Sequence, residues 1–346
     1  MILSSFRKVN SRCKFSDMAN HNLIKIGVIG VGHLGRFHVE QLSTLENVEL
    51  IGIFDVNTEE CKKVGAQFSV SIFSDADKLM EVCDAISIVT PTTYHFEIAL
   101  EALKMGCHVF IEKPITETIE QAQQLLNHAE ANHKIIQVGH IERFNPAFLY
   151  VKNKNLSPKF VEIHRLAQFN SRGTDVPVIL DLMIHDIDIL LSMVNSSVKD
   201  IQASGVKVVS RTVDIANARI LFENGCVANI TASRISKEAM RKMRIFQEAT
   251  YTTVDFLKKS VEVYHVVDKC PIDMDENFIY PLEGHDKKYI IHEKPEILEH
   301  NALREELKHF ATVIQQGEQP DVDGQSAAAA LHLGLEIQKI IDNSIA

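Results

Sequence analysis

The sequence has few cysteines, no long apolar run and no metal-binding pattern. Its six cysteines are scattered without a C-x-x-C pair, which argues against a disulfide framework or a cysteine-based zinc site. No apolar run reaches the roughly 18 residues of a membrane span, and residues 1–22 lack the apolar core of a secretory signal. We therefore expect a cytoplasmic protein with reduced thiols and no membrane partner.

Positively charged residues are fewer than negatively charged ones. Lys and Arg number 36 against 46 Asp and Glu, which gives a net charge of −10 and argues against a nucleic-acid partner. A hydrophobic content of 45% is ordinary for a globular protein, and 346 residues usually exceed one core, so we expect two domains. Residues 1–22 are expected to form a disordered N-terminal extension, in which Met18 is an alternative start to Met1.

The first part of the chain alternates between strand and helix patterns up to about residue 140. Strands are expected at 24–29, 48–54, 69–72, 85–90, 107–111 and 135–138. Helices are expected at 34–44, 57–66, 76–81, 94–105 and 117–132. This alternation predicts an α/β fold with a doubly wound parallel sheet, and ligands of such sheets gather at the carboxyl ends of the strands. We assign residues 23–145 to this domain.

Residues 146–346 follow a different pattern, which predicts an α+β domain with a large, mostly antiparallel open sheet. Helices are expected at 147–154, 178–194, 297–316 and 323–343, and strands at 159–168, 198–210, 213–222, 225–235, 242–250 and 261–267. We expect this domain to bind substrate. We also expect it to form a homodimer or homotetramer, because an apolar sheet face that stays exposed in a monomer favours association. The last helix is expected to pack back on the first domain.

A G-x-G-x-x-G motif follows the first expected strand. Gly30 permits a tight turn, Gly32 leaves room for phosphates, and Gly35 lets the next helix pack closely. His33 and Leu34 lie between the glycines, where the first N–H groups of the helix and its dipole favour an anionic ligand. The motif predicts a dinucleotide site, although the spacing alone is a weak signal.

Asp55 ends the second expected strand, about 25 residues after Gly30, near the spacing of a ribose-binding acid. Its carboxylate would accept from two ribose hydroxyls and repel a 2′-phosphate, so NAD is favoured over NADP. The alternative is that Asp55 merely begins a turn with Asn57.

Four more segments carry polar groups to the ends of strands or into the second domain. They are Thr90-Pro91-Thr92-Thr93-Tyr94-His95, Glu112-Lys113-Pro114, Gly139-His140-Ile141-Glu142-Arg143-Phe144-Asn145-Pro146, and Asp181 through His185 to Asp188. We expect Thr90, Pro91 and His95 to line the cofactor crevice. The alternative for His95 is a helix-start residue without a ligand role.

With these motifs the chain resembles the glucose–fructose oxidoreductase and inositol dehydrogenase family (Gfo/Idh/MocA) from Lys25 to its C-terminus. E-K-P followed by D-x-x-x-H-x-x-D is much more specific than the glycine motif. The resemblance implies a Rossmann domain followed by an α/β domain with an open sheet. It also implies a catalytic group of Lys113, Asp181 and His185, and a place near the nicotinamide ribose for Glu112.

The chemistry of these side chains suits oxidation of a secondary alcohol. Such a reaction needs a hydride acceptor, which nicotinamide provides, and a base for the hydroxyl proton. His185 has an ordinary pKa of about 6.5, while Lys113 can donate to the substrate oxygen. Asp181 lies four residues before His185, on the same face of a helix, where it would orient the imidazole or bind a substrate hydroxyl. The pair is also half a metal site, but no further His or Cys lies at ligand spacing and no metal is expected.

The G-H-I-E-R-F-N-P and D-L-M-I-H-D-I-D segments resemble the branch of the family that acts on UDP-linked N-acetyl sugars, which implies oxidation of a 3-hydroxyl to a ketone. Arg143 and Arg172 are candidates for binding the diphosphate or for pairing with carboxylates. Asn145 is a candidate for binding substrate or for capping the next helix. Alternatives are a myo-inositol or polyol dehydrogenase, a keto-sugar reductase, and a noncatalytic NAD-binding sensor or scaffold.

Overall fold

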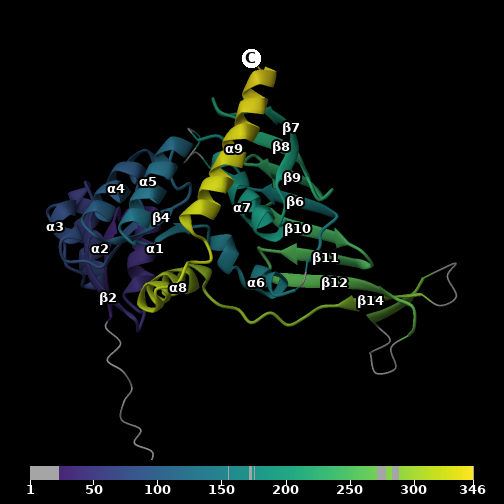
Figure 1. Cartoon of the computed structure of the whole chain (residues 1–346), viewed down its shortest axis with the longest axis horizontal. Coiled ribbons are helices and arrows are strands. Elements are labelled where there is room, and N and C mark those ends of the chain that lie inside the picture. The colour runs from purple at the N-terminus through teal and green to yellow at the C-terminus, as the bar shows by residue number, and fades with distance from the viewer. Residues whose placement is uncertain are drawn as a thin grey trace, which may run out of the picture.

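The computed structural model of the chain contains two sheets side by side, with helices on and between them (Figure 1). It describes residues 23–154, 156–170, 174, 176–270, 278–282 and 288–345. Within these ranges, none of the helices has both the length and the apolar character needed to cross a bilayer.

The N-terminal sheet is parallel, with strand order β2-β1-β3-β4-β5. Its strands are β1 (Ile24–Ile29), β2 (Val48–Phe54), β3 (Ala85–Ile88), β4 (His108–Glu112) and β5 (Ile136–Gly139). Its helices are α1 (His33–Leu42), α2 (Thr58–Phe68), α3 (Ala76–Met80), α4 (His95–Lys104) and α5 (Ile119–Ala131). Residues 69–72, expected as a strand, contribute only an isolated bridge between Ile53 and Ile72.

This strand order fixes where a ligand can bind. β1 pairs with both β2 and β3, so the chain leaves β1 in one direction and returns on its other side. The crevice beyond the carboxyl ends of β1 and β3 is therefore the topological switch point, at which doubly wound sheets hold their ligands.

The C-terminal sheet is mixed and mostly antiparallel, with nine strands in the order β13-β14-β12-β11-β10-β6-β9-β8-β7 within the described ranges. Only the β6–β9 pair among these is parallel. The strands are β6 (Phe160–Leu166), β7 (Val198–Val206), β8 (Ile215–Phe222), β9 (Val227–Ser233), β10 (Met240–Gln247), β11 (Thr250–Asp255), β12 (Ser260–Val267), β13 (Ile279–Pro281) and β14 (Tyr289–Glu293).

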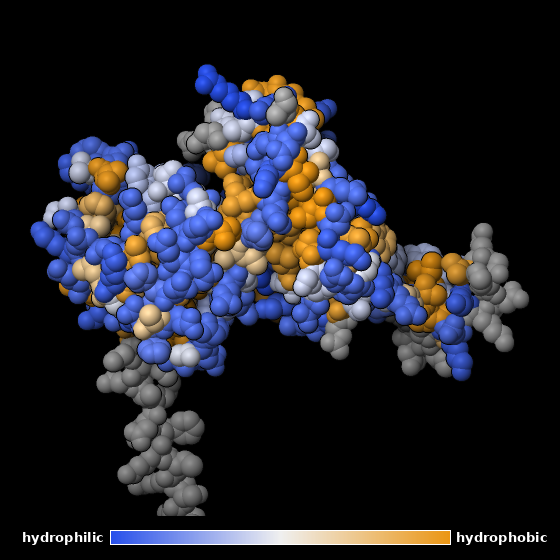
Figure 2. All heavy atoms as spheres, turned by 45° about the horizontal axis from the view of Figure 1, so that its top comes forward, coloured by the Kyte–Doolittle hydropathy of each residue, from blue (hydrophilic) through white to orange (hydrophobic). Residues whose placement is uncertain are grey.

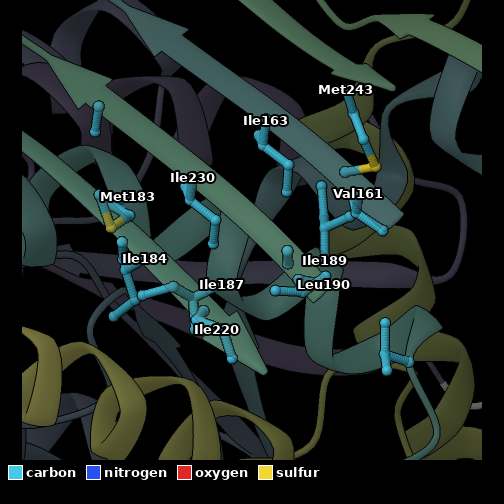
Figure 3. Close-up of a cluster of buried hydrophobic side chains, with 14 of the residues drawn as sticks. Val161, Ile163, Met183, Ile184, Ile187, Ile189, Leu190, Ile220, Ile230 and Met243 are labelled. Carbon is cyan, nitrogen blue, oxygen red and sulfur yellow. The ribbon is translucent and has the colours of Figure 1, made fainter. Parts of the chain in front are cut away.

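Helices cover one face of this second sheet. They are α6 (Pro146–Lys152), the π-turn η3 (Ile179–Met183), α7 (Ile184–Met193) and α9 (Gly324–Ile345). Figure 3 shows apolar side chains from η3 and α7 meeting those of the strands, including Ile187 against Ile220 and Ile230. Because these side chains are fully buried, η3 and α7 are held rigidly over the sheet.

The last two helices join the two halves. α8 (Ala302–Gln316) packs against α1, and α9 runs along α7 and β7 while its first turns contact α5 and β5 (Figure 1). Gly324, at the start of α9, lies so close to Leu126 and Ile136 that an added Cβ would come within 2.6 Å of the Leu126 side chain.

The other face of the second sheet carries a rung of stacked rings. Phe160, Phe246, Tyr251, Tyr264 and His292 lie opposite one another on five neighbouring strands. Their ring centroids are separated in turn by 5.4, 4.8, 5.5 and 4.4 Å. Figure 2 views the molecule from the side covered by α9 rather than from the face with the rings; it shows apolar side chains gathered over the half that holds this sheet, whereas the other half is mostly hydrophilic.

Candidate active site

The glycine motif forms the turn between β1 and α1. Gly30 has a φ of 89°, a left-handed conformation that favours glycine, and its N–H donates to the Phe54 carbonyl at 2.8 Å. A Cβ on Gly35 would lie 1.9 Å from the Gly30 carbonyl oxygen, whereas one on Gly32 would meet no heavy atom within 4 Å. The first and third glycines are therefore needed by the fold, and the open space beside Gly32 is left for a ligand. His33 and Leu34 are exposed at the start of α1.

Asp55 is tied to this turn by its carboxylate. Oδ2 accepts from the Val31 N–H at 2.7 Å, and Oδ1 accepts from the Asn57 N–H at 2.8 Å. The turn with Asn57 considered from the sequence is therefore present. The same carboxylate borders the crevice beside the glycines, so the two roles are compatible.

A cavity of ≈ 400 Å³ lies at the switch point. It is lined by Ile29, Gly30, Gly32, Phe54, Asp55, Val56, Val89, Thr90, Pro91, Tyr94 and Ile98. Its walls are mainly apolar, and the Thr90 hydroxyl is buried without a hydrogen-bond partner in the described part of the chain. An apolar slot with a carboxylate, a bare glycine backbone and an unsatisfied hydroxyl suits a planar base joined to a ribose and phosphates. Val56, Tyr94 and Ile98 were not predicted, because apolar side chains at strand and helix ends have no distinctive sequence signal.

His95, expected to line the cofactor crevice, does not line this cavity, and both of its ring nitrogens face backbone carbonyls. Its Nδ1 faces the Pro114 carbonyl and its Nε2 faces the Thr90 carbonyl, both at 2.9 Å. Burial lowers the pKa of His95, and the contacts with the two carbonyls oppose that effect. A neutral ring donates to only one of these carbonyls. The residue thus joins the end of β3 to the segment after β4.

Glu112 ends β4 in a chain of buried polar groups. Its Oε1 lies 3.1 Å from His38 Nε2, and His38 Nδ1 lies 3.0 Å from Ser87 Oγ. Burial by itself raises the pKa of Glu112, but the hydrogen bond and charge of His38, together with the Lys113 charge, lower it overall. A Cβ on Gly139 of the next strand would lie 2.7 Å from Glu112 Oε1, so β5 passes close beside this carboxylate.

Lys113 reaches from the first sheet to the second half of the chain. Its Nζ donates to the Asp181 backbone carbonyl at 2.7 Å and lies 3.4 Å from Asp181 Oδ1. The peptide bond between Lys113 and Pro114 is cis. The structure thus brings together two residues that lie 68 positions apart in sequence.

His185 lies one turn further on, where the chain passes from a π-turn into an α-helix. Asp181 belongs to the π-turn η3, and α7 begins at Ile184. A π-turn has i→i+5 hydrogen bonds, and such turns are frequent at functional sites. Burial, followed by the charges of Lys113, Arg165, His140 and Arg241, lowers the pKa of His185 well below its ordinary value.

Two residues expected to bind substrate instead make hydrogen bonds within the protein. Arg143 is buried and makes a bidentate pair with Asp188, with Nε at 2.6 Å and Nη2 at 3.1 Å from the carboxylate oxygens. Asn145 donates from Nδ2 to Glu142 and to the Phe256 carbonyl, and its Oδ1 caps α6 by accepting from the Ala147 N–H. Both residues therefore take the structural alternative considered from the sequence. Arg172 lies outside the described residues.

A buried ionic network that the sequence did not reveal lies beside His185. Arg165 on β6 donates to both oxygens of Asp186 at 2.8 Å and to Glu142 Oε1 at 2.9 Å. Arg241 on β10 contacts the same Glu142 oxygen at 3.2 Å. Burial raises the pKa of Asp186, although the Arg165 charge opposes this. The network fixes α7 to the sheet through Asp186, the residue that follows the candidate base.

No three His, Cys, Asp or Glu side chains converge closely enough to hold a metal ion within the residues that the structure describes. The functional groups that do converge are an ammonium, a carboxylate and an imidazole beside a dinucleotide-type crevice. This fold and this site define a nucleotide-dependent oxidoreductase.

Comparison with known proteins identifies the family. Residues 24–140 match the oxidoreductase family with an NAD-binding Rossmann fold, and residues 145–250 match the GFO/IDH/MocA C-terminal domain. The chain belongs to the Gfo/Idh/MocA family of NAD(P)-dependent dehydrogenases that act on CH–OH groups. The resemblance stated from the sequence motifs is confirmed.

Several relatives match nearly the whole chain. A UDP-N-acetylglucosamine 3-dehydrogenase of Acidithiobacillus ferrooxidans is 35% identical over 92% of this chain and 97% of its own length. A solved structure of that enzyme superposes with a TM-score of 0.84 at 34% identity, covering 93% of this chain and 99% of that one. A myo-inositol 2-dehydrogenase of Thermotoga maritima is 24% identical over 92% of this chain and 96% of its own length.

Proposed function

We propose that this protein oxidises the 3-hydroxyl of a UDP-linked N-acetylhexosamine to a ketone, with NAD as the hydride acceptor. The observation that carries the proposal is the contact between Lys113 and Asp181, made across the two halves of the chain next to His185. The choice of sugar is supported by the 35% identity to a UDP-N-acetylglucosamine 3-dehydrogenase over 92% of the chain.

His185, Lys113 and Asp181 have distinct roles in the proposed reaction. His185, whose pKa is lowered, stays neutral near pH 7 and accepts the proton of the substrate hydroxyl. The Lys113 ammonium, which donates to the Asp181 carbonyl in this structure, turns to the substrate oxygen and stabilises the developing negative charge. The Asp181 carboxylate, partly exposed, accepts from a neighbouring sugar hydroxyl or orients the catalytic groups.

The cofactor would be held by the turn of Gly30 to Gly35, by Asp55 and by the cavity around Thr90 and Pro91. The bound nicotinamide supplies the hydride acceptor. A carboxylate at Asp55, already close to two backbone N–H groups, supports NAD rather than NADP, because a 2′-phosphate would bring negative charge against it. Glu112 is proposed to border the nicotinamide ribose.

Recognition of the diphosphate must use other groups than Arg143, whose guanidinium is committed to Asp188. We retain Arg172 as the candidate. Arg241 is a second one, because its side chain is 46% exposed and, among the described residues, its guanidinium contacts one oxygen of Glu142.

The test is turnover of UDP-N-acetylglucosamine with NAD, followed by the absorbance of NADH. We expect turnover with this substrate, little with free N-acetylglucosamine, and less with NADP than with NAD. A second candidate, a polyol dehydrogenase, is favoured by the 24% identity to a myo-inositol 2-dehydrogenase. Turnover of myo-inositol without activity on the nucleotide sugar would replace our proposal, and activity on neither would contradict both.

A further inference from the structure

His140 is a buried histidine that the reaction described above does not use. It directly follows β5, and Gly139 pairs with Glu112 in the parallel register, so His140 and Lys113 extend from the ends of adjacent strands. The residue is 1% exposed. Neither of its ring nitrogens has a hydrogen-bond partner within the described residues. Leaving buried polar atoms unpaired costs free energy, so such a residue calls for an explanation.

The neighbour of this ring is the candidate base. The centroids of His140 and His185 lie 6.0 Å apart with their planes at 86°, an edge-to-face contact. His185 Nδ1 is itself buried without a hydrogen-bond partner within the described part of the chain. Among the described residues, no hydrogen bond to this nitrogen thus orients the base. Catalytic imidazoles that bind no metal are commonly held by a hydrogen bond to their second nitrogen.

We propose that His140 is a positioning residue for the dehydrogenase: its ring edge packs against His185 and fixes that imidazole beside the Lys113 ammonium. The inference rests on the proposed function, because it takes His185 as the base. Ring packing replaces the usual carboxylate partner here, since Asp186 and Asp188 on the same helix are committed to Arg165 and Arg143.

Charged groups face this pair from several elements. Those that act on His185 are Lys113 after β4, His140 after β5, Arg165 on β6 and Arg241 on β10. Those that act on His140 are Asp188 on α7, Arg143 on the 3₁₀ turn η2 (Ile141–Phe144), Lys113 and Glu112. Burial, as the largest cause, lowers the pKa of both histidines, so both rings are neutral near pH 7.

The variants His140→Ala and His140→Phe separate ring packing from other roles. Alanine removes the edge contact and admits water, whereas phenylalanine keeps a ring of similar shape. We expect His140→Ala to lower kcat by about 10- to 100-fold, the cost of a misplaced catalytic group, with KM for NAD nearly unchanged. His140→Phe should recover most of that loss. Equal kcat in His140→Ala and the unchanged protein would overturn the proposal, as would an equal loss in both variants.

A readout without substrate keeps this inference separate from the proposed function. Histidine NMR titration of the full chain, with His185→Asn used to assign the signal, follows the His185 pKa directly. Hydration in His140→Ala should raise that pKa toward its ordinary value, and the acidic limb of kcat/KM should move to higher pH. An unmoved His185 titration would refute the positioning role even in an active enzyme. A moved titration in a protein that turns over no sugar would leave the packing inference intact and reject only the proposed reaction.

His108→Asn is the matched control. His108 is also a poorly exposed histidine of low pKa, about 4 through burial, but it stands at the opposite end of β4 from Lys113. Its Nδ1 accepts from the Ile135 N–H at 3.0 Å, an acceptor that the asparagine oxygen can replace. We expect its kcat and His185 titration to match those of the unchanged protein. Thermal melting of all variants identifies any that fail to fold. If His140→Ala does not fold, His140→Phe is the variant compared with the unchanged protein.

Discussion

At the scale of single residues, the catalytic role proposed for Lys113 is the most direct one to test. Its side chain is 19% exposed, and its ammonium contacts the Asp181 carbonyl and carboxylate. We expect Lys113→Ala to lower kcat by about 100-fold or more, the typical effect of losing one donor to a developing oxyanion. Binding of NAD, measured by calorimetry, should change little.

Lys104→Ala is the control for this substitution. Lys104 forms an exposed pair with Glu101 on α4, and such pairs contribute little. Its kinetics should equal those of the unchanged protein. Full activity in Lys113→Ala would reject the catalytic assignment.

Glu306 on α8 gives a second residue-scale prediction, on stability. Both of its carboxyl oxygens are buried without a hydrogen-bond partner within the described residues. Burial, then the charges of Glu112 and Asp188, raises its pKa well above the ordinary 4.5. The folded protein therefore keeps a proton that the unfolded chain releases. The contribution of this protonation to the unfolding free energy is complete below pH 4.5 and is lost as the pH rises through the pKa of Glu306 in the folded state.

Glu306→Gln cannot ionise, so its unfolding free energy should fall less steeply than that of the unchanged protein as pH rises above this point. Melting temperatures measured from acid to mildly alkaline pH give the comparison. Glu305→Gln, the preceding residue on the same helix, is the control. Parallel curves for Glu306→Gln and the unchanged protein would contradict the prediction.

At the scale of elements, the glycine turn makes two kinds of demand on the chain. Gly35 is required by close packing and Gly32 only by the ligand, according to the space beside each. Gly35→Ala should therefore lower the unfolding free energy by roughly 1–3 kcal/mol, as overpacking does, and weaken dinucleotide binding as well. Gly32→Ala should leave melting unchanged and weaken binding by about tenfold or more, roughly 1.4 kcal/mol. Melting scans and calorimetry with NAD distinguish the two, and a normal affinity in Gly32→Ala would place the phosphates elsewhere.

Most elements could be predicted from the sequence because their patterns are periodic. The five parallel strands are short and mainly apolar, as sheets covered on both faces require, and the helices between them have one apolar stripe. The hairpin of β10 and β11 was missed and read as one strand over 242–250. Its turn at Glu248 and Ala249 contains no Gly, Pro or Asn, and Ala249 nevertheless takes a φ of 55°. Pairing of the two strands, rather than turn chemistry, decides this conformation.

The residues of the candidate site likewise divide into those that the sequence predicted and those that it did not. Motif positions predicted the glycine turn and Asp55, because both lie at strand ends, whereas the meeting of Lys113 with Asp181 was implied by the resemblance to the family. The partners of Arg143, Asn145 and His95 were not predictable in this way. Their occupancy depends on carbonyl and carboxylate groups brought in by distant parts of the chain, such as the Phe256 carbonyl on Asn145.

At the scale of the whole molecule, the open face of the nine-stranded sheet is the natural place for self-association. It carries the rung of stacked rings from Phe160 to His292, bordered by polar side chains such as Asn217 and Thr231. We predict a homodimer or homotetramer in solution, measured by light scattering. Asn217→Arg should weaken it, since symmetry places the new charges close together. Lys62→Glu, on exposed α2, should not. A monomer at all concentrations would contradict the prediction.

The contact between Lys113 and Asp181 has one more consequence. The reacting groups themselves form part of the seam between the two lobes, so catalytic competence is a property of their alignment and of neither lobe alone. Mild heat or urea that loosens this seam, while both sheets stay folded, stops the chemistry first, because local opening costs less free energy than global unfolding. Inactivation thus becomes a sensitive gauge of lobe alignment, well before the secondary structure melts.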